Sequence, residues 1–134
     1  MVELSRSWRA NHSVEERKAF LAAVINSIPT PVLVKDDQHT YLAVNDAFTA
    51  FFHRDAKEII GRNDYDFFSS EDAKFYQDTD RDALGKGCVI EYEHAYAINE
   101  SIQWMLVRKS PLIAPDGERF VVLVLVNEKL LAIQ

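Results

Sequence analysis

Apolar side chains recur at helical spacing between Ser13 and Ile28. Ser13 and Glu16 form the Ser-x-x-Glu pattern of a capping box, in which the hydroxyl and the carboxylate satisfy free amides at a helix start. The apolar positions that follow keep the helical period until Pro29 ends it: Phe20, Leu21, Val24, Ile25 and Ile28. The pattern predicts an amphipathic helix over residues 13–28, preceded by a leader or linker over residues 1–12.

Short strand-like and helical patterns follow. Two runs rich in β-branched residues, Pro31–Lys35 and Thr40–Val44, flank a polar stretch and are typical of a β-hairpin. Asn45 then has a side chain suited to capping a helix, and the apolar residues behind it share one helical face: Ala47, Phe48, Phe51 and Phe52. We expect Asp55 to cap a further short turn that ends at Gly61.

The second half of the chain indicates one long helix and three strands. Residues 69–72 begin the helix, Gly85 or Gly87 ends it, and its expected buried side carries Phe75, Tyr76, Thr79, Ala83 and Leu84. The strands run roughly over Cys88–Ile98, Ile102–Ile113 and Glu118–Val126. Because the strands are grouped and do not alternate with helices, we predict an α+β fold with an antiparallel sheet and helices on one face.

The last two strands are apolar on both sides. In Ile102–Val107 and Phe120–Val126, residues of both parities are largely apolar, so neither sheet face is suited to water. One face would cover the helical cluster. We expect the other face to be covered by the 13–28 helix, by a second subunit, or by both.

Composition narrows the classes of protein. A chain of 134 residues with 48% hydrophobic content is expected to form one domain with a real core. The net charge of -6 argues against binding to nucleic acid, which needs clustered basic residues. A lone cysteine, Cys88, and the absence of an apolar run of about 20 residues or a secretory signal predict a soluble, cytoplasmic chain.

Four segments carry a family resemblance. Ile28–Asp36 reads Ile-Pro-Thr-Pro-Val-Leu-Val-Lys-Asp, and Tyr41–Phe48 reads Tyr-Leu-Ala-Val-Asn-Asp-Ala-Phe. Ile59–Phe68 and the residues Arg108–Leu112, which precede Asp116-Gly117, complete the set. In this order they resemble the opening, the centre and the last turn of bacterial PAS domains, over about residues 19–126.

The resemblance implies a five-stranded antiparallel sheet that encloses a pocket, with residues 29–126 as the PAS core and 127–134 as the exit to an output domain. Such domains sit in histidine kinases, cyclic-dinucleotide enzymes or transcriptional regulators, and they are sensors without catalytic activity. They often dimerise through a helix before the first strand. We therefore expect a homodimer through the 13–28 helix and the outer sheet face, with these residues at the interface: Phe20, Val24, Trp104 and Leu106.

The cofactor residues of two PAS branches differ in this chain. Flavin-binding members place a reactive cysteine after Gly-x-Asn, whereas Gly61-Arg62-Asn63 is followed by Asp64. Haem-binding members use a histidine on the long helix, and residues 71–84 contain none. We expect neither a flavin adduct nor haem. His94 is the one histidine expected to face a pocket, and a hydrogen-bonded structural role is favoured for it.

Asp64 and Asp66 have the spacing of paired carboxylates, which general acid and base catalysis uses. An isomerase-like α+β enzyme is one interpretation, but we favour a structural one in which Asp64 caps a short helical turn. No Ser/His/Asp order, phosphate-binding glycine loop or metal-ligating cluster occurs in the sequence. We assign no catalytic residue and no metal site.

The resemblance also orients the strand that carries Lys109. It implies that Met105, Val107 and Lys109 point inward and that Trp104, Leu106 and Arg108 point outward. A buried lysine needs an anionic ligand or a carboxylate such as Glu91 or Glu93, unless Lys109 reaches water at the strand end. The expected pocket lining comprises Phe48, Phe52, Phe67, Phe75, Met105, Val107, Lys109 and Leu123.

Three functions stay open at the level of sequence, and two of them are favoured. The first is a sensor whose pocket binds a small metabolite, for instance an organic acid, and thereby changes the geometry of a dimer. The second is an interaction module with a collapsed core that dimerises or docks a partner without a ligand. The isomerase-like enzyme is a third, less favoured possibility.

Overall fold

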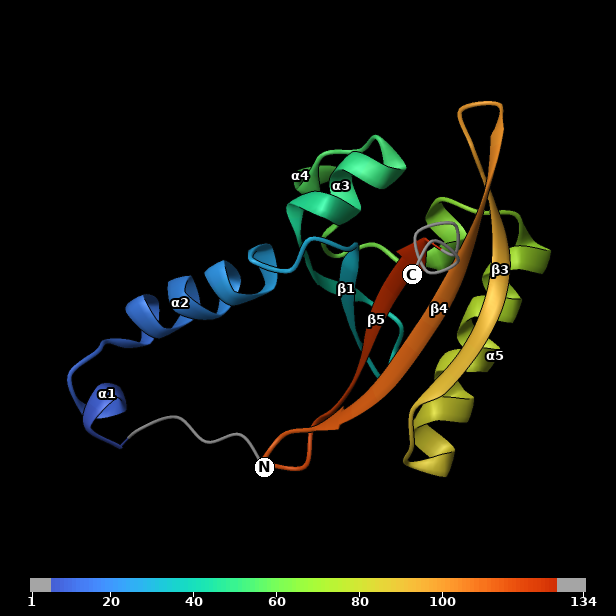
Figure 1. Cartoon of the computed structure of the whole chain (residues 1–134). Coiled ribbons are helices and arrows are strands. Elements are labelled where there is room, and N and C mark those ends of the chain that lie inside the picture. Colours follow the sequence, from blue (N-terminus) through green and yellow to red (C-terminus); the bar gives the residue numbers. More distant parts are fainter. Residues whose placement is uncertain (1–5, 128–134) are drawn as a thin grey trace.

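The computed structural model describes residues 6–127. Helices and strands follow one another in an order that begins with two helices, and Figure 1 labels most of them. Their bounds are α1 (Arg6–Ala10), α2 (Val14–Asn26), β1 (Val32–Asp36), β2 (Tyr41–Val44), α3 (Asp46–Phe52), α4 (Ala56–Ile59), the 3-10 turn η1 (Asp64–Asp66), α5 (Ser70–Lys86), β3 (Ile90–Ile98), β4 (Ser101–Ile113) and β5 (Arg119–Asn127). The five strands agree with the expected ranges to within two residues.

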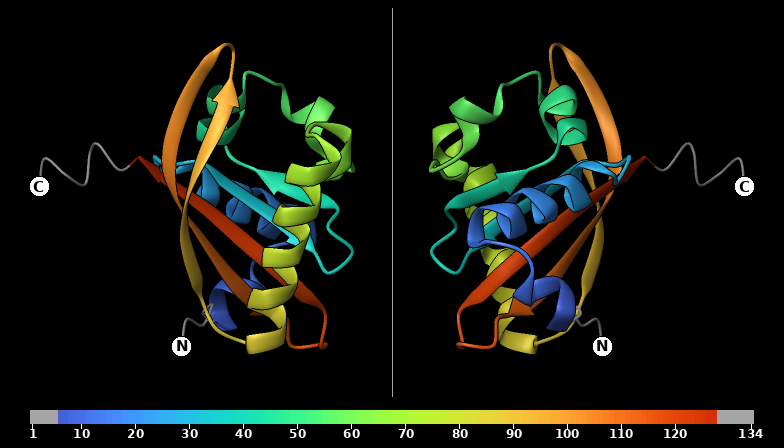
Figure 2. Two further views of the ribbon diagram at one scale, coloured as in Figure 1. Left: turned by 90° about the vertical axis from the view of Figure 1, so that its right-hand side faces the viewer. Right: turned by 90° about the vertical axis from the view of Figure 1, so that its left-hand side faces the viewer.

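The strands form one antiparallel sheet in the order β2-β1-β5-β4-β3. The helices α3 to α5 gather on one side of this sheet, and α5 contacts both β4 and β5 (Figure 2). The predicted α+β class, the antiparallel sheet and the five strands are therefore confirmed. None of the helices formed by residues 6–127 has the length and apolar character that crossing a membrane requires.

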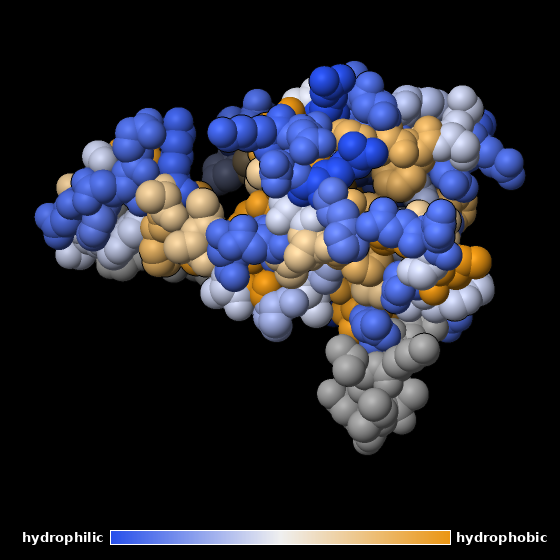
Figure 3. Space-filling model, turned by 90° about the horizontal axis from the view of Figure 1, so that it is seen from above, coloured by the Kyte–Doolittle hydropathy of each residue, from blue (hydrophilic) through white to orange (hydrophobic). Residues whose placement is uncertain are grey.

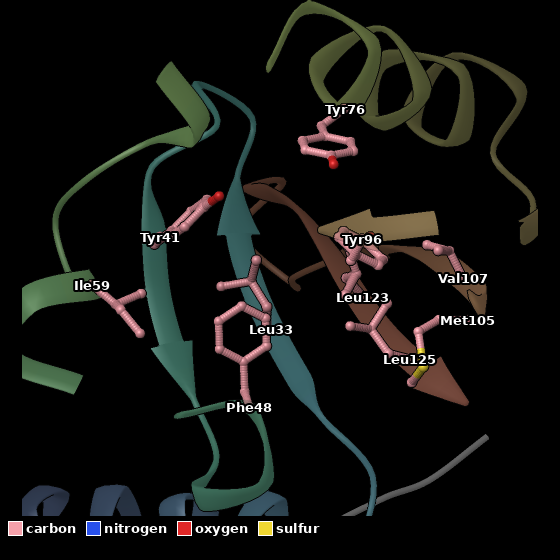
Figure 4. Packing of buried hydrophobic residues seen from close by; sticks show 10 residues of the cluster. All are labelled: Leu33, Tyr41, Phe48, Ile59, Tyr76, Tyr96, Met105, Val107, Leu123 and Leu125. Carbon is pink, nitrogen blue, oxygen red and sulfur yellow. The ribbon is translucent and has the colours of Figure 1, made fainter. Parts of the chain in front are cut away.

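Alternation along β4 and β5 separates an inner from an outer sheet face. Met105, Val107 and Lys109 are buried, whereas Trp104 is 58% exposed, which agrees with the expected directions. Pairing puts Val107 opposite Leu125 and Lys109 opposite Leu123 on the inner face. The apolar core lies between this face and the helices (Figure 4) and comprises Leu33, Tyr41, Phe48, Ile59, Tyr76, Tyr96, Met105, Val107, Leu123 and Leu125.

Two of the four N-terminal caps expected from the sequence are present in the structure. The capping box of Ser13 and Glu16 is present, and the Asn45 side chain accepts the Phe48 amide at the start of α3. Asp55 makes no side-chain capping bond to α4. The expected cap by Asp64 is wrong: Asn63 caps the η1 turn, and Asp64 is buried.

The long helix α5 ends where glycine allows a left-handed backbone, at Gly87 with a φ of 64°. Tyr76 and Ala83 lie on its buried side, as expected. Phe75 was also expected there, but it is 40% exposed. Tyr76 and Asp80, four residues apart, define the buried stripe, and Phe75 lies to one side of it.

The N-terminal helix forms where expected but does not cover the sheet. None of the α2 residues is buried, and Phe20, Leu21 and Val24 are at least 40% exposed. The α1–α2 pair projects from the body of the domain (Figures 1 and 3). Residues 6–12 of the expected leader include helix α1, whose Trp8 stacks on His12 and lies against Phe20, with ring centroids 4.4 and 4.7 Å away.

Asn45 ties the projecting helix to the core. Its Nδ2 donates to the carbonyl oxygens of Ile25, Ile28 and Thr30 at 2.9–3.1 Å. Its Oδ1 accepts the amides of Val32 and Phe48 at 2.9 and 3.0 Å. One buried side chain thus joins the end of α2, the linker, β1 and α3, and each of its bonds replaces one that water would otherwise supply.

Asn45→Asp tests this junction. The carboxylate keeps the oxygens that cap α3 but faces three carbonyl oxygens without a donor, so the free energy of unfolding should fall by about 2 kcal/mol or more. Urea denaturation measures this change. Asn26→Asp is the control, because the Asn26 Oδ1 accepts the Asp46 amide at the surface and an aspartate oxygen can do the same. This variant should change the free energy of unfolding by no more than about 0.5 kcal/mol. Equal losses in the two variants would contradict the assigned role.

Candidate functional site

Four charged side chains lie beneath α5 in the centre of the domain. Lys35 of β1, Lys109 of β4, Asp64 of η1 and Asp80 of α5 are each no more than 1% exposed. We call these four residues the charge cluster. Two ammonium groups face two carboxylates, so the cluster is electrically balanced, as burial of charge requires.

Asp80 is the centre of the charge cluster. Its carboxylate accepts Lys35 Nζ at 2.8 Å, Lys109 Nζ at 2.7 Å and His39 Nδ1 at 2.9 Å. Burial alone would raise the pKa of Asp80, but the His39 bond and the two lysine charges outweigh it and hold that pKa well below its ordinary value. Asp80 is therefore ionised and forms an internal counter-ion for both lysines.

His39 connects the charge cluster to the surface. It lies in the β1–β2 turn with a φ of 66°, and its side chain is buried. Arg81 donates to Nε2 at 3.2 Å. Because a guanidinium only donates, Nε2 accepts and Nδ1 carries the hydrogen that Asp80 accepts. This pair of bonds holds the hairpin turn against α5.

Asp64 occupies the other side of the charge cluster. Both of its oxygens accept Lys35 Nζ at 2.9 Å, and one accepts the Tyr41 hydroxyl at 2.6 Å. Burial, followed by the nearby Asp64 charge, raises the pKa of Tyr41 far above its usual value. The hydroxyl of Tyr41 is thus a fixed donor to Asp64.

Lys109 points inward, but its expected counter-ions were wrong. Its Nζ donates to Asp80, the Thr79 hydroxyl and the Tyr76 carbonyl, at 2.7, 2.7 and 2.8 Å. Glu91 lies on the outer face and pairs with Arg108 at 3.1 Å, and Glu93 is exposed there. All three donors of Lys109 are used, so Lys109 needs no anionic ligand.

The interior beside the charge cluster is closed. A cavity of about 20 Å³ remains there, lined by residues that include Leu33, Phe52 and Leu123. A space of this size holds about one water molecule. Neither carboxylate of the cluster has room for a substrate next to it. Asp66 does not join Asp64, because it bonds the Asn63 amide at 2.9 Å, so the two carboxylates do not converge as an acid/base pair.

A larger cavity lies at the end of the helical layer. It has a volume of about 170 Å³ and lies between α3, α4, η1 and the β3–β4 turn. We call it the aromatic cavity. Half of its lining residues are aromatic, and the lining comprises Tyr41, Phe48, Phe52, Arg54, Ile59, Phe67, Phe68, Ala97, Ile98 and Asn99.

The residues expected to line one pocket are thus divided among the aromatic cavity, the small interior cavity, an open groove and positions that line none of these spaces. Phe48, Phe52 and Phe67 line the aromatic cavity, and Leu123 lines the small interior one. Met105 lines an open groove of about 560 Å³ between the residues before β1, α3 and the ends of β4 and β5. Phe75, Val107 and Lys109 line none of these three spaces. Whether the residues bind a ligand stays a prediction.

His94 makes a structural contact. Its Nε2 lies 2.9 Å from the Tyr76 hydroxyl, and Phe75 stacks on the ring at 5.5 Å. Partial burial lowers the pKa of His94. Within residues 6–127, no group of three or more His, Cys, Asp or Glu side chains is placed to hold a metal ion.

Sequence reasoning missed three residues of this region: Lys35, His39 and Asp80. Lys35 directly follows the apolar run Val32–Val34, which is a usable signal because Leu33, two residues earlier on the same strand, faces inward. Asp80 lies between Tyr76 and Ala83 on the buried helix stripe, which is a second signal. His39 had no such pattern, since turn residues lack a period.

Known proteins share this fold. A family model described as the PAS fold matches residues 25–128. The uncharacterized protein y4lL of Sinorhizobium fredii is 32% identical over 96 residues, which cover 71% of this chain and 12% of that protein. The chain therefore corresponds to a small part of that relative's length.

Two solved structures superpose well on the chain. The PAS domain of Bordetella pertussis BvgS has a TM-score of 0.72 and 14% identity, over 87% of this chain and 92% of that one. The phage VqmA–DPO complex has a TM-score of 0.75 and 17% identity, over 88% of this chain and 56% of that one. At such identities the likeness establishes the fold alone.

Asp80→Asn tests the role of the charge cluster in stability. Removing this carboxylate charge leaves two buried lysines with one counter-ion, so we expect a loss of about 3–5 kcal/mol in the free energy of unfolding. Asp78→Asn is the matched control on the same helix. Asp78 accepts hydrogen bonds from Lys74 and Arg81 at the surface. The Asp78→Asn variant should therefore lose no more than about 1 kcal/mol in the free energy of unfolding. Similar losses in urea denaturation would show that the cluster does not hold the fold.

Acid should weaken the protein through Asp80. Its folded pKa lies below the ordinary value of about 3.9, so its stabilisation is complete above that value and is lost as the pH falls toward the folded pKa. The free energy of unfolding should decline as the pH falls below about 4. The decline should be shallower in Asp80→Asn than in Asp78→Asn. Parallel pH profiles of the two variants would contradict this assignment.

Proposed function

The chain belongs to the PAS family, and we propose that it regulates an attached output domain by forming a homodimer through α2 and the outer sheet face. Members of this family are in general sensory and signalling modules without catalytic activity of their own. A histidine kinase or a cyclic-dinucleotide enzyme is the output that we propose for the whole protein.

The uncovered outer sheet face carries this proposal. Trp104 and Ile102 of β4 are 58% and 68% exposed, and Leu112 is 48% exposed. Valines of the neighbouring strands continue the apolar face and are only partly buried: Val34, Val122, Val124 and Val126. A contiguous apolar face of this kind is typical of a protein interface.

The partner that fits this face is a second copy of the chain. Helix α2 presents Phe20, Leu21 and Val24 partly to solvent and buries none of its residues, so most of its apolar surface stays exposed in the single chain even though Trp8 packs against Phe20. A two-fold dimer uses the same surface patch on both subunits. The α2 helix and the outer sheet face of each subunit would then both lie in the interface, and α2 would pack on an outer sheet face there. Burying both surfaces in one step removes two apolar areas from water.

The homodimer predicts a specific effect of one charge on the outer face. Trp104→Glu places a carboxylate at the proposed interface, so the variant should be monomeric where the unmodified chain is dimeric, with the same circular dichroism spectrum. Sedimentation velocity over a concentration series measures this. Ile60→Glu is the control, because Ile60 is 43% exposed but belongs to the α4 end on the helical side. An unmodified chain that stays monomeric throughout the series would refute the proposal.

A second role, ligand sensing, is favoured by the aromatic cavity. The phage VqmA structure, which shares the fold, is a complex with DPO. A ligand in the cavity would change the output only if it binds two arrangements of the protein with different affinity. Helix α3 is suited to this coupling, since it lines the cavity with Phe48 and Phe52 and is capped by Asn45, which also holds the end of α2.

A further inference from the structure

The aromatic cavity has one charged group. Among its described lining residues, Arg54 alone carries a charge at neutral pH, and Tyr41 and Asn99 are the other residues with polar side chains. The Tyr41 hydroxyl is committed to Asp64 at 2.6 Å. Its ring, and not its hydroxyl, therefore belongs to the wall of the cavity. The remaining polar groups, on Arg54 and Asn99, come from two different loops.

We propose that the aromatic cavity binds a small aromatic monocarboxylate, with its ring between the phenylalanines and its carboxylate at Arg54. The assignment rests on the sensory role proposed above and is independent of the homodimer. It also replaces the anion site that sequence had suggested at Lys109, because the charge cluster satisfies that lysine internally.

The volume of the cavity fits one ring. It measures about 170 Å³, and an apolar protein cavity of about 150 Å³ is known to hold benzene. The small interior cavity of about 20 Å³ next to it admits no ring. A ligand with a single six-membered ring therefore matches the space, and the open side toward the surface leaves room for a short polar group.

The walls of the cavity suit a flat aromatic group. The ring centroids of Phe48 and Phe52 lie 4.7 Å apart, and the ring of Phe52 meets that of Phe68 edge to face with a centroid distance of 6.0 Å. Phe67 stacks on Tyr41 at 5.9 Å. Rings prefer edge-to-face and offset contacts at these separations, and a ligand ring inserted here would make several such contacts at once.

Arg54 is available for an anion. Its guanidinium lies over the Phe67 ring, 4.8 Å from the centroid. Its ion pair with Glu58 is long, at 3.8 Å, and both side chains are about half exposed. An exposed pair of this kind contributes little, whereas a carboxylate held by the planar fork of an arginine forms two parallel bonds. A ligand carboxylate can therefore displace Glu58.

The cavity discriminates against other charges. Among the residues of the described part of the chain that line it, none is a carboxylate, since Asp64 faces the neighbouring interior and is bonded to Lys35. An ammonium group on the ligand would meet the like charge of Arg54, and the nearest carboxylate, Glu58, already pairs with that arginine at 3.8 Å, so a cation is disfavoured there. Asn99, at the tip of the β3–β4 turn with a φ of 47°, adds an amide to the rim that can donate to an anion.

Isothermal titration calorimetry with benzoate as the probe tests the assignment. Benzyl alcohol keeps the ring without the charge, benzylamine reverses the charge, and acetate keeps the charge without the ring. Benzoate should bind more tightly than all three. Arg54→Gln should weaken benzoate binding by about tenfold or more and leave benzyl alcohol binding unchanged. Arg119→Gln, an exposed arginine on β5 outside the aromatic cavity, is the matched control and should bind benzoate normally.

Any of the following results would overturn the assignment: no heat of binding with benzoate, equal binding of benzoate and benzyl alcohol, or an Arg54→Gln variant that binds benzoate as the unmodified chain does. Equal binding of acetate would also overturn it, because the site would then recognise a charge without a ring. The same titration on the Trp104→Glu variant separates this proposal from the homodimer. If the Trp104→Glu variant binds benzoate as the unmodified chain does, the cavity assignment holds, whether or not the unmodified chain forms a dimer.

Discussion

The fold depends on the cost of burying charge. Lys35 and Lys109 lie on two different strands of the inner face, and neither ammonium group has access to water. Asp80 can neutralise both only if α5 lies across β1 and β4 at one fixed position along its axis. Apolar contacts alone tolerate small sliding of a helix on a sheet, whereas bonds of 2.7–2.9 Å to one carboxylate do not. The charge cluster therefore sets the position of the long helix, and with it the small interior cavity, which Tyr76 of α5 helps to line.

A self-neutralised centre also divides the domain into a fixed part and a responsive part. Beneath α5 the lysines, carboxylates and the His39 turn are fully bonded, and there is almost no free volume. The aromatic cavity lies beyond this region, among short elements and turns whose walls are rings and one loosely paired arginine. Segments with fewer fixed polar bonds change arrangement at lower free-energy cost. The ligand sensing proposed above is therefore expected to act on α3, α4 and the β3–β4 turn, and Asn45 links this part to α2.

Local patterns in the sequence predicted most of the fold. The strands, the Ser13 capping box and the Asn45 cap follow from periodicity and from side chains acting within a few residues. The inward direction of Lys109 came from family resemblance, but its partner could not be found locally, because Asp80 is 29 residues away in sequence and lies in a polar stretch. The same holds for Asp64, whose position favoured a cap while its actual partners, Lys35 and Tyr41, are on β1 and β2. The packing of α2 was also beyond prediction, since an apolar helix face does not specify which surface covers it.

The two faces of β4 explain how one strand contributes both to the buried charge cluster and to the proposed dimer surface. Successive residues point to opposite sides, so Lys109 is bound to α5 while Arg108 pairs with Glu91 on the outer face. The same alternation puts Met105 in the core and Trp104 on the uncovered face. A shift of β4 relative to β5 would disturb the charge cluster, which makes such sliding costly. Under the proposed function, a signal from the aromatic cavity to the proposed dimer surface is therefore better carried by a rotation of α2 about its attachment at Asn45 than by movement within the sheet, because this route leaves the buried charges paired throughout.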